Sequence, residues 1–504
     1  MTTLPHVYNG QALPLAKVPE LTMSEFRTVV LERIADGRRI SSFFGMPHGD
    51  GIALLAVLAN DRQGVLELCR TQVRDAYPAL TPEAPQAHWF EREIAEQWGI
   101  VPEGHPWLKP IRFHPCYRKG SDAWGRDKAR AIEPCVTDYF RVDGEEIHEV
   151  AVGPVHAGII EPGHFRFQCH GENVLHLEIE LGYQHRGIER AIIAGPGQRT
   201  AHYVETLAGD TTIGHATAFA LAIEALGGTT APPRAQALRA VALEIERLAN
   251  HTGDLGALAN DVGFLPTASF CGRLRGDFLN ATALLCGNRF GRHLVRPGGV
   301  RFDLTTRIAD ELLKRIETTF ADTENAVNLL WQTPSVMARF EGTGTVSCHD
   351  AAAMGLVGPA ARASGVSLDV RNDLPWGAYR AHHVPTVSLP AGDVCARAYV
   401  RWFEVRNSVR FIAEEIAALP AGAIQQEPAR PAPDHLAVAL VEGWRGEICH
   451  VAITDDRGRL RHYKVTDPSF HNWFGLAMAL RGQQISDFPL CNKSFNLSYC
   501  GHDL

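Results

Sequence analysis

The sequence predicts an α+β protein with more than one domain, and three observations support this class. Residues 51–58, "GIALLAVL", form a short apolar run typical of a buried strand. Residues 200–330 and 393–419 are rich in alanine and leucine at helical spacing, which indicates a central helical bundle. After the breaker "PARPAPD", the chain returns to short strands in "HLAVALVEG" and "RHYKVTD".

The first predicted unit is an α/β domain over residues 1–115. Besides the strand at 51–58, residues 61–75 have a helix-like pattern. The segment "HWFEREIAEQWGI" places Phe90, Ile94 and Trp98 at helical spacing, so we expect a second helix there.

The second predicted unit covers residues 148–504 and follows a linker. Residues 116–147 are polar, carry both charges and lack periodicity, which is typical of a surface linker. "HFRFQC" and "GENVLHLEIEL" alternate as in a small β-sheet with a turn at Gly171. The central helical bundle and a C-terminal α+β segment complete this unit.

Composition narrows the class of protein. A chain of 504 residues is too long for one ordinary domain, so two or three are expected. Its 45% hydrophobic and 21% charged residues are normal for a globular protein. The net charge is −8 and there is no lysine/arginine block, which argues against nucleic-acid binding. We expect no secretory signal and no membrane-spanning segment, so other chains would hold the protein at any membrane.

The cysteines indicate neither a disulfide framework nor a metal site built by this chain alone. Their number is eleven, and no two stand in C-x-x-C spacing. We therefore expect scattered thiols that behave as small hydrophobic side chains. They are Cys69, Cys116, Cys135, Cys169, Cys271, Cys286, Cys348, Cys395, Cys449, Cys491 and Cys500.

One glycine-rich connection is a candidate ligand loop. "AVGPVHAGIIEPGHFRF" gathers Gly153, Pro154, His156, Gly158 and Gly163. Such a loop can bring a histidine and bare backbone close to a ligand. An ordinary hairpin loop with a surface histidine would have the same composition.

Three further motifs concentrate polar side chains and stay open to more than one interpretation. "LGYQHRGIER" suits a site or a solvated helix start with local ion pairs. "EIERLANHTGDLG" places Glu246, Asn250 and Asp254 on one helical face beside His251, which suits a buried network, a subunit contact or a solvent face. The arginines of "GNRFGRHLVRPGGVRFDL" suit carboxylate or partner binding, or an ordinary surface.

Taken together and in order, the motifs resemble a known family. "WFEREIAEQWGIVPEGHPWLKPIRF" resembles the C-type (30 kDa-type) subunit of respiratory complex I. "GPVHAGIIEPGHFRF", "LGYQHRGIER", "EIERLANHTGDLG", "VRPGGVRFDL", "GDVCARAYVRWFE", "VEGWRGE" and "YKVTDPSFHNW" are similar to the D-type (49 kDa-type) subunit and to the large subunit of group 4 membrane-bound [NiFe] hydrogenases. The residues of these motifs are more similar to the formate hydrogenlyase and hydrogenase-4 branch. The resemblance covers residues 85–504. It implies a complex I C-type α/β domain followed by a [NiFe]-hydrogenase-large-subunit-like domain.

The resemblance also implies where a nickel–iron centre would be bound, and the sequence departs from it there. The family's four thiolate positions map to Ala208, Thr211, Ser498 and Gly501, and none is a cysteine. Cys500 lies between two of them, at a position not used for ligation. Because nickel and low-spin iron require soft thiolates, we expect no NiFe centre and no hydrogen turnover. The few residues after Cys500 also suggest that no C-terminal extension is removed.

In complex I, the resemblance implies, the emptied cavity binds a quinone headgroup through a loop histidine and a tyrosine. The histidine maps to His156, which could donate a hydrogen bond and a proton to a carbonyl oxygen. Tyr203 is a candidate for the tyrosine, although an ungapped count places that tyrosine near Gly209. Asp210, Thr211 and His215 are expected in the same cavity. Asp210 suits either proton transfer or a structural hydrogen bond.

Two functions follow as expectations. The first is an electron-transfer subunit of a quinone-linked, NADH dehydrogenase-like oxidoreductase complex, coupled to ion translocation. The second is a structural coupling subunit without a substrate of its own. The expected partners are a small subunit with one [4Fe–4S] cluster, a ferredoxin-like subunit, and integral membrane proton-channel and antiporter-like subunits, on the cytoplasmic side of the inner membrane. No flavin or nucleotide motif occurs in the chain, and no cofactor besides a quinone is expected on it.

Overall fold

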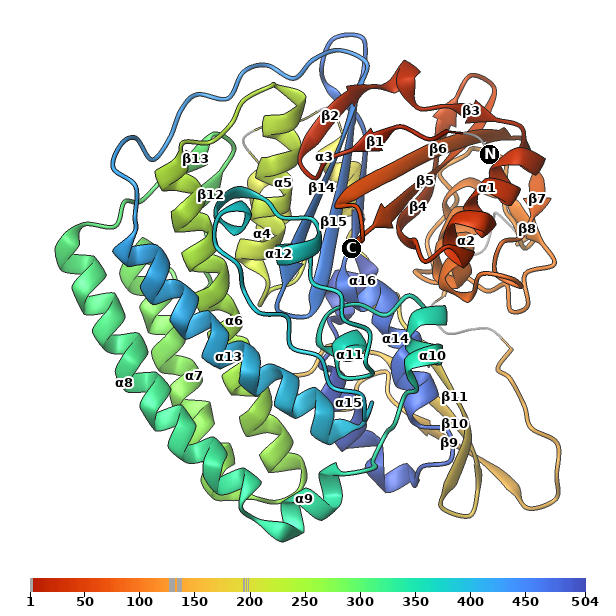
Figure 1. The fold of residues 1–504 in the computed structure, drawn as a ribbon. Coiled ribbons are helices and arrows are strands. Elements are labelled where there is room, and N and C mark those ends of the chain that lie inside the picture. Colours follow the sequence, from red (N-terminus) through yellow and green to blue (C-terminus); the bar gives the residue numbers. More distant parts are fainter. Residues whose placement is uncertain (1–2, 127–131, 134–137, 194, 196, 198) are drawn as a thin grey trace.

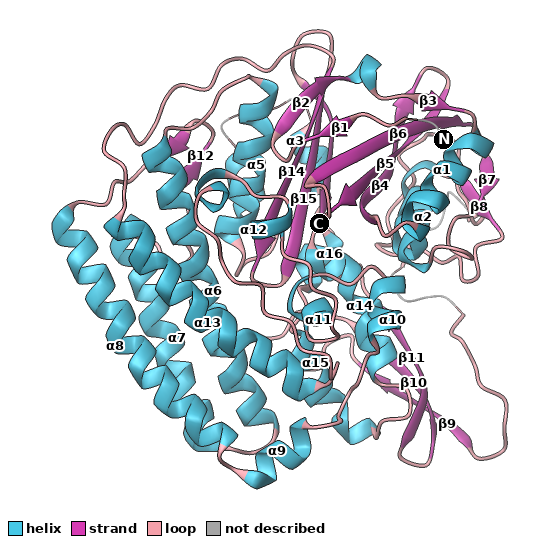
Figure 2. Ribbon diagram, viewed as in Figure 1, coloured by secondary structure: helices cyan, strands magenta, loops and turns pink. Residues whose placement is uncertain are grey.

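The computed structural model describes residues 3–126, 132–133, 138–193, 195, 197 and 199–504. A helical bundle stands beside two stacked β-sheets, and a small third sheet lies at the lower end of the molecule (Figures 1 and 2). This mixed architecture confirms the predicted α+β class.

The N-terminal sheet has two helices on one face. Its strands are β1 (His6–Val7), β3 (Glu20–Leu21), β4 (Arg39–His48), β5 (Gly51–Asn60) and β6 (Val65–Val73), in the order β1-β6-β5-β4 with β3 parallel to β6. Helix α1 (Met23–Ala35) begins at a capping box between Thr22 and Glu25. Helix α2 (His88–Trp98) confirms the helix predicted from residues 88–100. A parallel pair, β7 (Ala76–Pro78) and β8 (Val101–Glu103), flanks it.

The helix predicted for residues 61–75 is wrong, because this segment forms strand β6. Leu66 and Leu68 belong to one apolar core, whereas Cys69 and Val73 belong to another on the opposite face. A strand buried on both faces carries apolar residues on both sides, so its two-residue period is obscured.

The C-terminal sheet packs against the free face of the N-terminal sheet. Its strands are β2 (Gln11–Pro14), β14 (His435–Gly443), β15 (Gly446–Thr454) and β16 (Leu460–Thr466), in the order β16-β15-β14-β2. Leu440 and Val451 of this sheet share a core with Leu55 of the other. Because β2 pairs with β14, the first residues of the chain are part of a sheet made by its last quarter.

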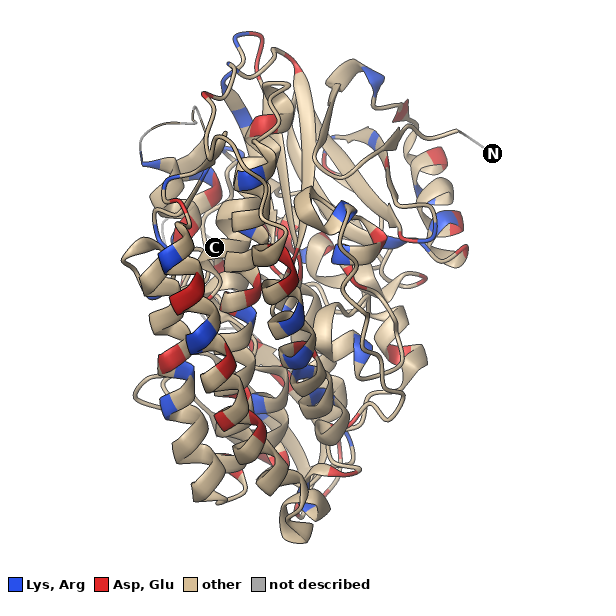
Figure 3. Ribbon diagram, turned by 60° about the vertical axis from the view of Figure 1, so that its left-hand side comes forward, with Lys and Arg blue, Asp and Glu red and all other residues tan. Residues whose placement is uncertain are grey.

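The helical bundle lies on the other face of the C-terminal sheet. Its long helices are α5 (Thr212–Leu226), α6 (Pro233–Asp261), α7 (Leu265–Cys286), α8 (Thr306–Trp331) and α13 (Val394–Ala417). Helix α5 contacts β14 and β15, and α6 packs on both α7 and α13. In the view of Figure 3, acidic and basic segments are mixed along these helices. Two-stranded β12 (Val295–Arg296) and β13 (Gly299–Val300) follow α7.

The small sheet and the last helices enclose the region that carries the site. The sheet has the order β11-β10-β9, with β9 (Ile147–Val152), β10 (His164–His170) and β11 (Asn173–Glu180), and it turns at Gly171 as predicted. The last helices are α14 (Pro468–Ala479), α15 (Phe488–Phe495) and α16 (Tyr499–Asp503). The other short helices are α3 (Ile188–Ile192), α4 (Thr200–Glu205), α9 (Pro334–Phe340), α10 (Cys348–Ala353), α11 (Gly358–Arg362) and α12 (Val370–Asp373).

The predicted linker at 116–147 is described only in part. Residues 127–131 and 134–137 of it, including Cys135, lie outside the described residues. Near its end, the backbone N–H of Phe140 donates to Glu178 of β11. The boundaries at 115 and 148 stay a prediction. In the described part of the chain, no helix is both long and apolar enough to cross a membrane.

Candidate active site

A cavity of about 820 Å³ lies where three parts of the chain meet. They are the loop 152–161, the C-terminal half of α6, and the segment 485–500 around α15. Ile160, Phe488 and Leu497 give one apolar wall, whereas α6 contributes Asn250 and Asp254. Its volume suits a small-molecule ligand with an apolar part and a polar head.

The loop 153–163 is shaped by two glycines that no other residue could replace without a clash. Gly153 has φ = +96°, and a Cβ there would lie 2.1 Å from the carbonyl oxygen of Gly163. A Cβ on Gly163 would lie 2.4 Å from Cε1 of Tyr499. The bare backbone of Gly163 therefore makes room for the Tyr499 ring, which links this loop to the C-terminal segment.

His156 and Tyr499 form a polar pair in the cavity wall. Nε2 of His156 lies 3.1 Å from the Tyr499 hydroxyl, and both residues line the cavity. The Tyr499 ring also makes an edge contact with Trp473, with 4.9 Å between ring centroids. Burial lowers the pKa of His156 and raises the pKa of Tyr499, so the pair is an imidazole and a phenol that are both neutral near pH 7.

The tip of the β14–β15 hairpin reaches the floor of the cavity. Trp444 and Arg445 are its two turn residues, between Gly443 and Gly446. Both guanidinium Nη atoms of Arg445 donate to the Asp210 carboxylate, at 2.6 and 2.7 Å. Trp444 Nε1 donates to the Asp210 carbonyl oxygen, so the hairpin tip is fixed at the start of α5.

This bidentate ion pair decides the charge of the cavity floor. Burial by itself raises the pKa of Asp210, but the Arg445 guanidinium outweighs it and holds the pKa below its usual range. Asp210 is thus an ionised carboxylate that neutralises Arg445. A proton-carrying role would require this pair to separate first.

Thr211 and His215 are close to the floor but do not line the cavity. The Thr211 hydroxyl donates to Asp210 and accepts from Trp444 Nε1, at 3.1 Å in both cases. His215 is fully buried, with Nε2 3.0 Å from Asp467 and Nδ1 3.1 Å from Nε2 of His450. Both therefore act through Asp210 or Asp467 rather than on a ligand.

His215 begins a buried chain of polar groups that ends at Tyr463. Tyr463 lies 2.7 Å from Nδ1 of His450. Because an ionised Asp467 only accepts, Nε2–H of His215 donates to it, His450 donates to His215, and the Tyr463 hydroxyl donates to His450. Each N–H and O–H of these groups then has an acceptor.

Tyr203 lies apart from the cavity. It belongs to α4 and packs at the edge of an apolar cluster that includes Ile188, Val204 and Phe219. The structure does not bring Tyr203 to His156; Tyr499 has that place.

The three polar residues on one face of α6, Glu246, Asn250 and Asp254, have different positions relative to the cavity. Asn250 and Asp254 line the cavity; Asn250 donates to the Asp210 carbonyl oxygen, and Asp254 accepts from Arg401. Glu246 lies behind them and accepts from the backbone N–H groups of Ile213 and Gly214. Burial raises its pKa to about 8. Asp261, further along the cavity wall, has its pKa raised to about 6 by burial.

The four positions that correspond to thiolates do not fit a nickel–iron centre. Ala208 has no donor atom, and the Ser498 hydroxyl accepts from the N–H of Gly501 to cap α16. A Cβ on Gly501 would lie 2.6 Å from Cγ of Asp467, which His215 and the Ser469 N–H hold in place. A cysteine therefore has no space at Gly501, and the residues present offer no soft donor set.

Among the residues that the structure describes, one other group of side chains has the composition of a metal site. His202, Glu205 and His293 bring ligand atoms within 4.8 Å of one another. Arg296 donates to both Glu205 and Nδ1 of His293, so two of the three groups already have a cationic partner. The positive charge of Arg296 disfavours a metal cation at this place. Arg296, the first arginine of "VRPGGVRFDL", therefore has a structural role.

The motif "LGYQHRGIER" is partly held by the protein, because His185 and Glu189 are half-buried whereas Arg186 and Arg190 are exposed. His185 Nδ1 lies 2.7 Å from the carbonyl oxygen of Asp503, and Lys464 forms a 3.0 Å ion pair with Glu189. Lys464 also binds Glu93 of α2 at 2.6 Å, which ties the motif to the N-terminal domain. The motif therefore supports the C-terminal segment behind the cavity.

Sequence reasoning missed Tyr499, Trp444 and Arg445 as site residues. "VEGWRGE" contained a signal, because two bulky polar residues between glycines at the end of a strand suit a hairpin tip. "NLSYCGH" also contained one, since a tyrosine stands between the two positions that were compared for cysteine. No local pattern, however, shows that Tyr499 would meet His156.

Comparisons with known proteins found matches in both halves of the chain. The family described as "Respiratory-chain NADH dehydrogenase, 30 Kd subunit" matches residues 36–121, and the "Respiratory-chain NADH dehydrogenase, 49 Kd subunit" family matches residues 261–435. Formate hydrogenlyase subunit 5 of Escherichia coli (strain K12) is 30% identical over 444 residues, which are 84% of this chain and 76% of that protein.

Two further relatives show how widely the fold is shared. NADH-quinone oxidoreductase subunit 4 of Thermus thermophilus is 30% identical over 370 residues, which are 68% of this chain and 90% of that protein. A chain of the membrane-bound sulfane sulfur reductase, an archaeal respiratory membrane complex, has a TM-score of 0.67 at 23% identity and covers 72% of this chain and 100% of its own. This last likeness concerns the fold alone.

Proposed function

Because the chain belongs to the family that contains the 30 kDa-type and 49 kDa-type subunits of respiratory-chain NADH dehydrogenase and subunit 5 of formate hydrogenlyase, we propose that it reduces a quinone-like acceptor within a membrane-bound oxidoreductase complex. It is a hydrophilic-arm type of subunit. Electrons would come from a [4Fe–4S] cluster in a partner small subunit. The acceptor would bind in the cavity between loop 152–161 and the C-terminal segment.

The observation that carries this proposal is the His156–Tyr499 pair. One group of this pair donates to the other across 3.1 Å, so the pair keeps one N–H or O–H for a ligand. A quinone carbonyl oxygen gains negative charge on reduction and then takes up a proton, which suits a preorganised donor beside a group that can pass on a proton. The negative oxygen would favour protonation of the His156 imidazole from solvent, and His156 would then pass this proton to the oxygen. Tyr499 would hold the imidazole and the oxygen in place.

The cavity favours an acceptor site over the alternative, a coupling subunit without a substrate. A structural role predicts that side chains fill the space between "GPVHAG" and "AGDTTIGHA". Instead, His156 and Ala157 of the first motif line the same cavity as Gly209 and Asp210 of the second. A Cβ built on Gly209 meets nothing within 4 Å, so the space next to it is open.

A nickel–iron centre is not part of the proposal. The donor positions are Ala208, Thr211, Ser498 and Gly501, and the last has no space for a side chain. We therefore propose that the chain does not turn over hydrogen, unlike a hydrogenase of this family. Stoichiometric nickel in the purified complex, or hydrogen uptake with an artificial acceptor, would contradict this.

Membrane association through partners is consistent with the surface at the mouth of the cavity. Val155 is 79% and Ile159 is 99% exposed, which is unusual for apolar side chains next to a ligand site. We propose that integral membrane subunits of the proton-channel and antiporter-like types cover this loop, on the cytoplasmic side of the inner membrane. A ferredoxin-like subunit would supply electrons to the small subunit. Electron transfer to the acceptor would be coupled to ion translocation.

The test is quinone reduction by the assembled complex. Rates with two quinones of different headgroup are compared between wild type and His156→Ala. A loss of activity with both quinones, while the complex still assembles, supports the acceptor site. Unchanged rates with both quinones would favour the coupling subunit.

A further inference from the structure

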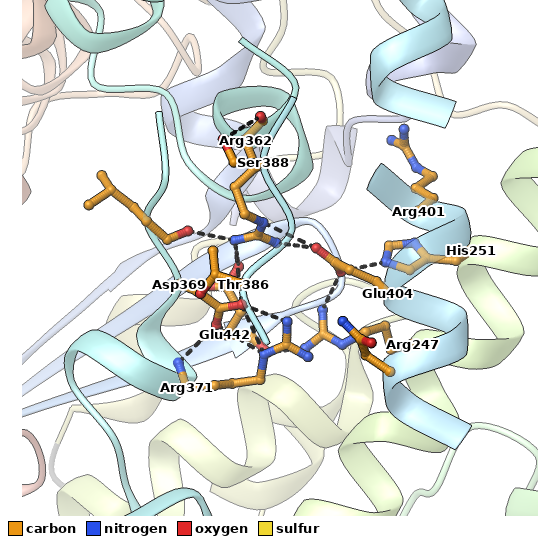
Figure 4. A network of polar contacts seen from close by, with 12 residues as sticks. Arg247, His251, Arg362, Asp369, Arg371, Thr386, Ser388, Arg401, Glu404 and Glu442 are labelled. Carbon is orange, nitrogen blue, oxygen red and sulfur yellow. Dashed lines mark hydrogen bonds and ion pairs between the residues drawn. The ribbon is translucent and has the colours of Figure 1, made fainter. Parts of the chain in front are cut away.

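Behind the cavity lies a set of buried charges that the proposed function does not use. Figure 4 labels all of them except Glu244 and shows the labelled side chains pointing toward one another from α6, α11, α13, β14 and the start of α12. None of their side chains is more than 2% exposed. We call this set the buried charge network; its members are Glu244, Arg247, His251, Arg362, Asp369, Arg371, Glu404 and Glu442.

The network contains more acids than bases. It has four carboxyl groups but only three guanidinium groups, so full ionisation with a neutral His251 leaves one negative charge in excess. An uncompensated charge on a fully buried side chain is far more costly than one bound proton. The network therefore needs a proton on one carboxyl group or on His251.

Three of the four carboxyl groups are well compensated. Glu404 accepts from Arg362, Arg247 and Nε2–H of His251. Glu244 accepts from Arg247 and Arg371, as well as from the hydroxyl groups of Tyr379 and Ser408. Asp369 binds Arg371 through both oxygens. These contacts stabilise the ionised form of each group.

Glu442 has the weakest compensation in the network. It accepts from one guanidinium, Arg362 Nη1 at 2.8 Å, and from the backbone N–H of Val370 at 3.1 Å. Arg362 is shared with Glu404. Burial raises the pKa of Glu442 to about 7, whereas the arginines lower the pKa of Glu244, with a value of about 2, and of Glu404, despite equal burial.

His251 is a poorer place for the proton. Its Nε2 already donates to Glu404 at 2.9 Å, and its Nδ1 is buried without a partner among the described residues. A protonated ring would bury an N–H donor that has no acceptor. Burial accordingly lowers the pKa of His251.

The charges that surround the network strengthen this assignment. On α12, Asp373 accepts from the backbone of Asp369. On β15, Glu447 lies opposite Glu442 in register and shares Arg39 with Asp61. These neighbours therefore bring three carboxyl groups and only one guanidinium, that of Arg39. The ion pair of Arg401 with Asp254 adds no net charge.

We propose that the buried charge network is a proton-binding site that keeps one exchangeable proton on Glu442. This site is directly connected to the cavity floor, because Glu442 precedes the hairpin tip by one glycine. Arg247 donates to the carbonyl oxygens of Glu442 and Gly443, which fixes that connection. The proton count follows from the network alone and does not depend on what the cavity binds.

The proposal is tested by infrared spectroscopy of the purified full chain during a pH titration through about 7. We expect the carbonyl band of a buried, protonated carboxylic acid that shifts in D₂O and loses intensity as the pH rises. Glu246, whose pKa burial raises to about 8, gives a band of the same kind, so the Glu442 component is the difference between the spectra of wild type and Glu442→Gln. The matched control is Glu224→Gln, another buried glutamate, which pairs one-to-one with Arg239 and should leave the band in place.

A second variant tests the charge count itself. Asp369→Asn leaves three carboxyl groups for three guanidinium groups, so the proton is no longer needed. We expect Asp369→Asn to move the titration of the Glu442 band to lower pH. This comparison with wild type does not need Glu442→Gln, so it tests the proposal even if that variant fails to fold. Identical carbonyl spectra of wild type and Glu442→Gln at every pH, or a Glu442 component that Asp369→Asn does not move, would each overturn the proposal.

Discussion

Nε2 of His156 and the hydroxyl oxygen of Tyr499 lie 3.1 Å apart although 343 positions separate them in the chain. The loop reaches this place because Gly153 and Gly163 approach each other without side chains. The tyrosine reaches it because Ser498 caps the short helix that Tyr499 begins. The pair therefore depends on two distant segments, and each residue can be tested by itself.

His156→Gln should lower the rate of quinone reduction by at least about 10-fold, because an amide can donate a hydrogen bond but not a proton. The measurement is kcat of the assembled complex with a short-chain quinone. His170→Gln is the control, since His170 is an exposed histidine on the neighbouring strand that pairs with Glu146. Equal rates in both variants would remove His156 from the mechanism.

Tyr499→Phe should raise KM more than it lowers kcat, because the variant keeps the ring against Trp473 and loses only the hydroxyl. One hydrogen bond contributes about 1 kcal/mol, so the expected change in KM is several-fold. Tyr203→Phe is the matched control on α4. If Tyr203→Phe impairs quinone reduction and Tyr499→Phe does not, the pairing of Tyr499 with the acceptor is wrong.

Much of the fold could be predicted because its elements have clear patterns of their own. The α2 segment, the hairpin at Gly171 and the long helices show either a helical or an alternating period. Strand β6 could not be predicted in the same way, because its two faces are buried by α1 and by the C-terminal sheet. Its pattern reflects its neighbours, which the local sequence does not contain.

The site was predicted less well than the fold for a related reason. His156 and Asp210 were predicted because each stands in a motif, and both line the cavity. Thr211 and His215 stand in the same motif as Asp210, but the α5 helix turns them toward Trp444 and Asp467. Direction around a helix, and the arrival of Tyr499 from the other end of the chain, are tertiary properties.

Gly501→Ala should destabilise the protein by about 1–3 kcal/mol, because the added Cβ would overlap Asp467, which cannot move away. The measurement is the free energy of unfolding. The control is Gly272→Ala in α7, where a Cβ meets nothing within 4 Å. That change should be neutral or stabilising by up to about 1 kcal/mol.

If Gly501→Ala is as well tolerated as Gly272→Ala, then the former thiolate position has space for a side chain. A cysteine at position 501 would then no longer be excluded by sterics. Nickel content of Gly501→Cys would have to be measured in that case.

The stability of Glu246→Gln should improve relative to wild type as the pH rises. Burial raises the pKa of Glu246 to about 8 in the folded protein, compared with 4.5 for an unperturbed glutamate. A raised pKa means that the folded state binds the proton more tightly than the unfolded state. The contribution of Glu246 is therefore fully present below about pH 4.5 and is lost as the pH rises through about 8.

Glutamine cannot ionise, so the variant escapes this loss. At about pH 5, we expect Glu246→Gln to be less stable than wild type, because an amide cannot accept from both Ile213 and Gly214 as the carboxyl group does. Between about pH 5 and pH 8, the difference should change in favour of the variant by up to about 1.4 kcal/mol per pH unit. Glu25→Gln, in the exposed capping box of α1, is the control, and its difference from wild type should stay constant because the hydrogen bond from Thr22 lowers the pKa of Glu25. A difference between Glu246→Gln and wild type that is the same at every pH would mean that Glu246 is ionised throughout, and that the back wall of the cavity is charged.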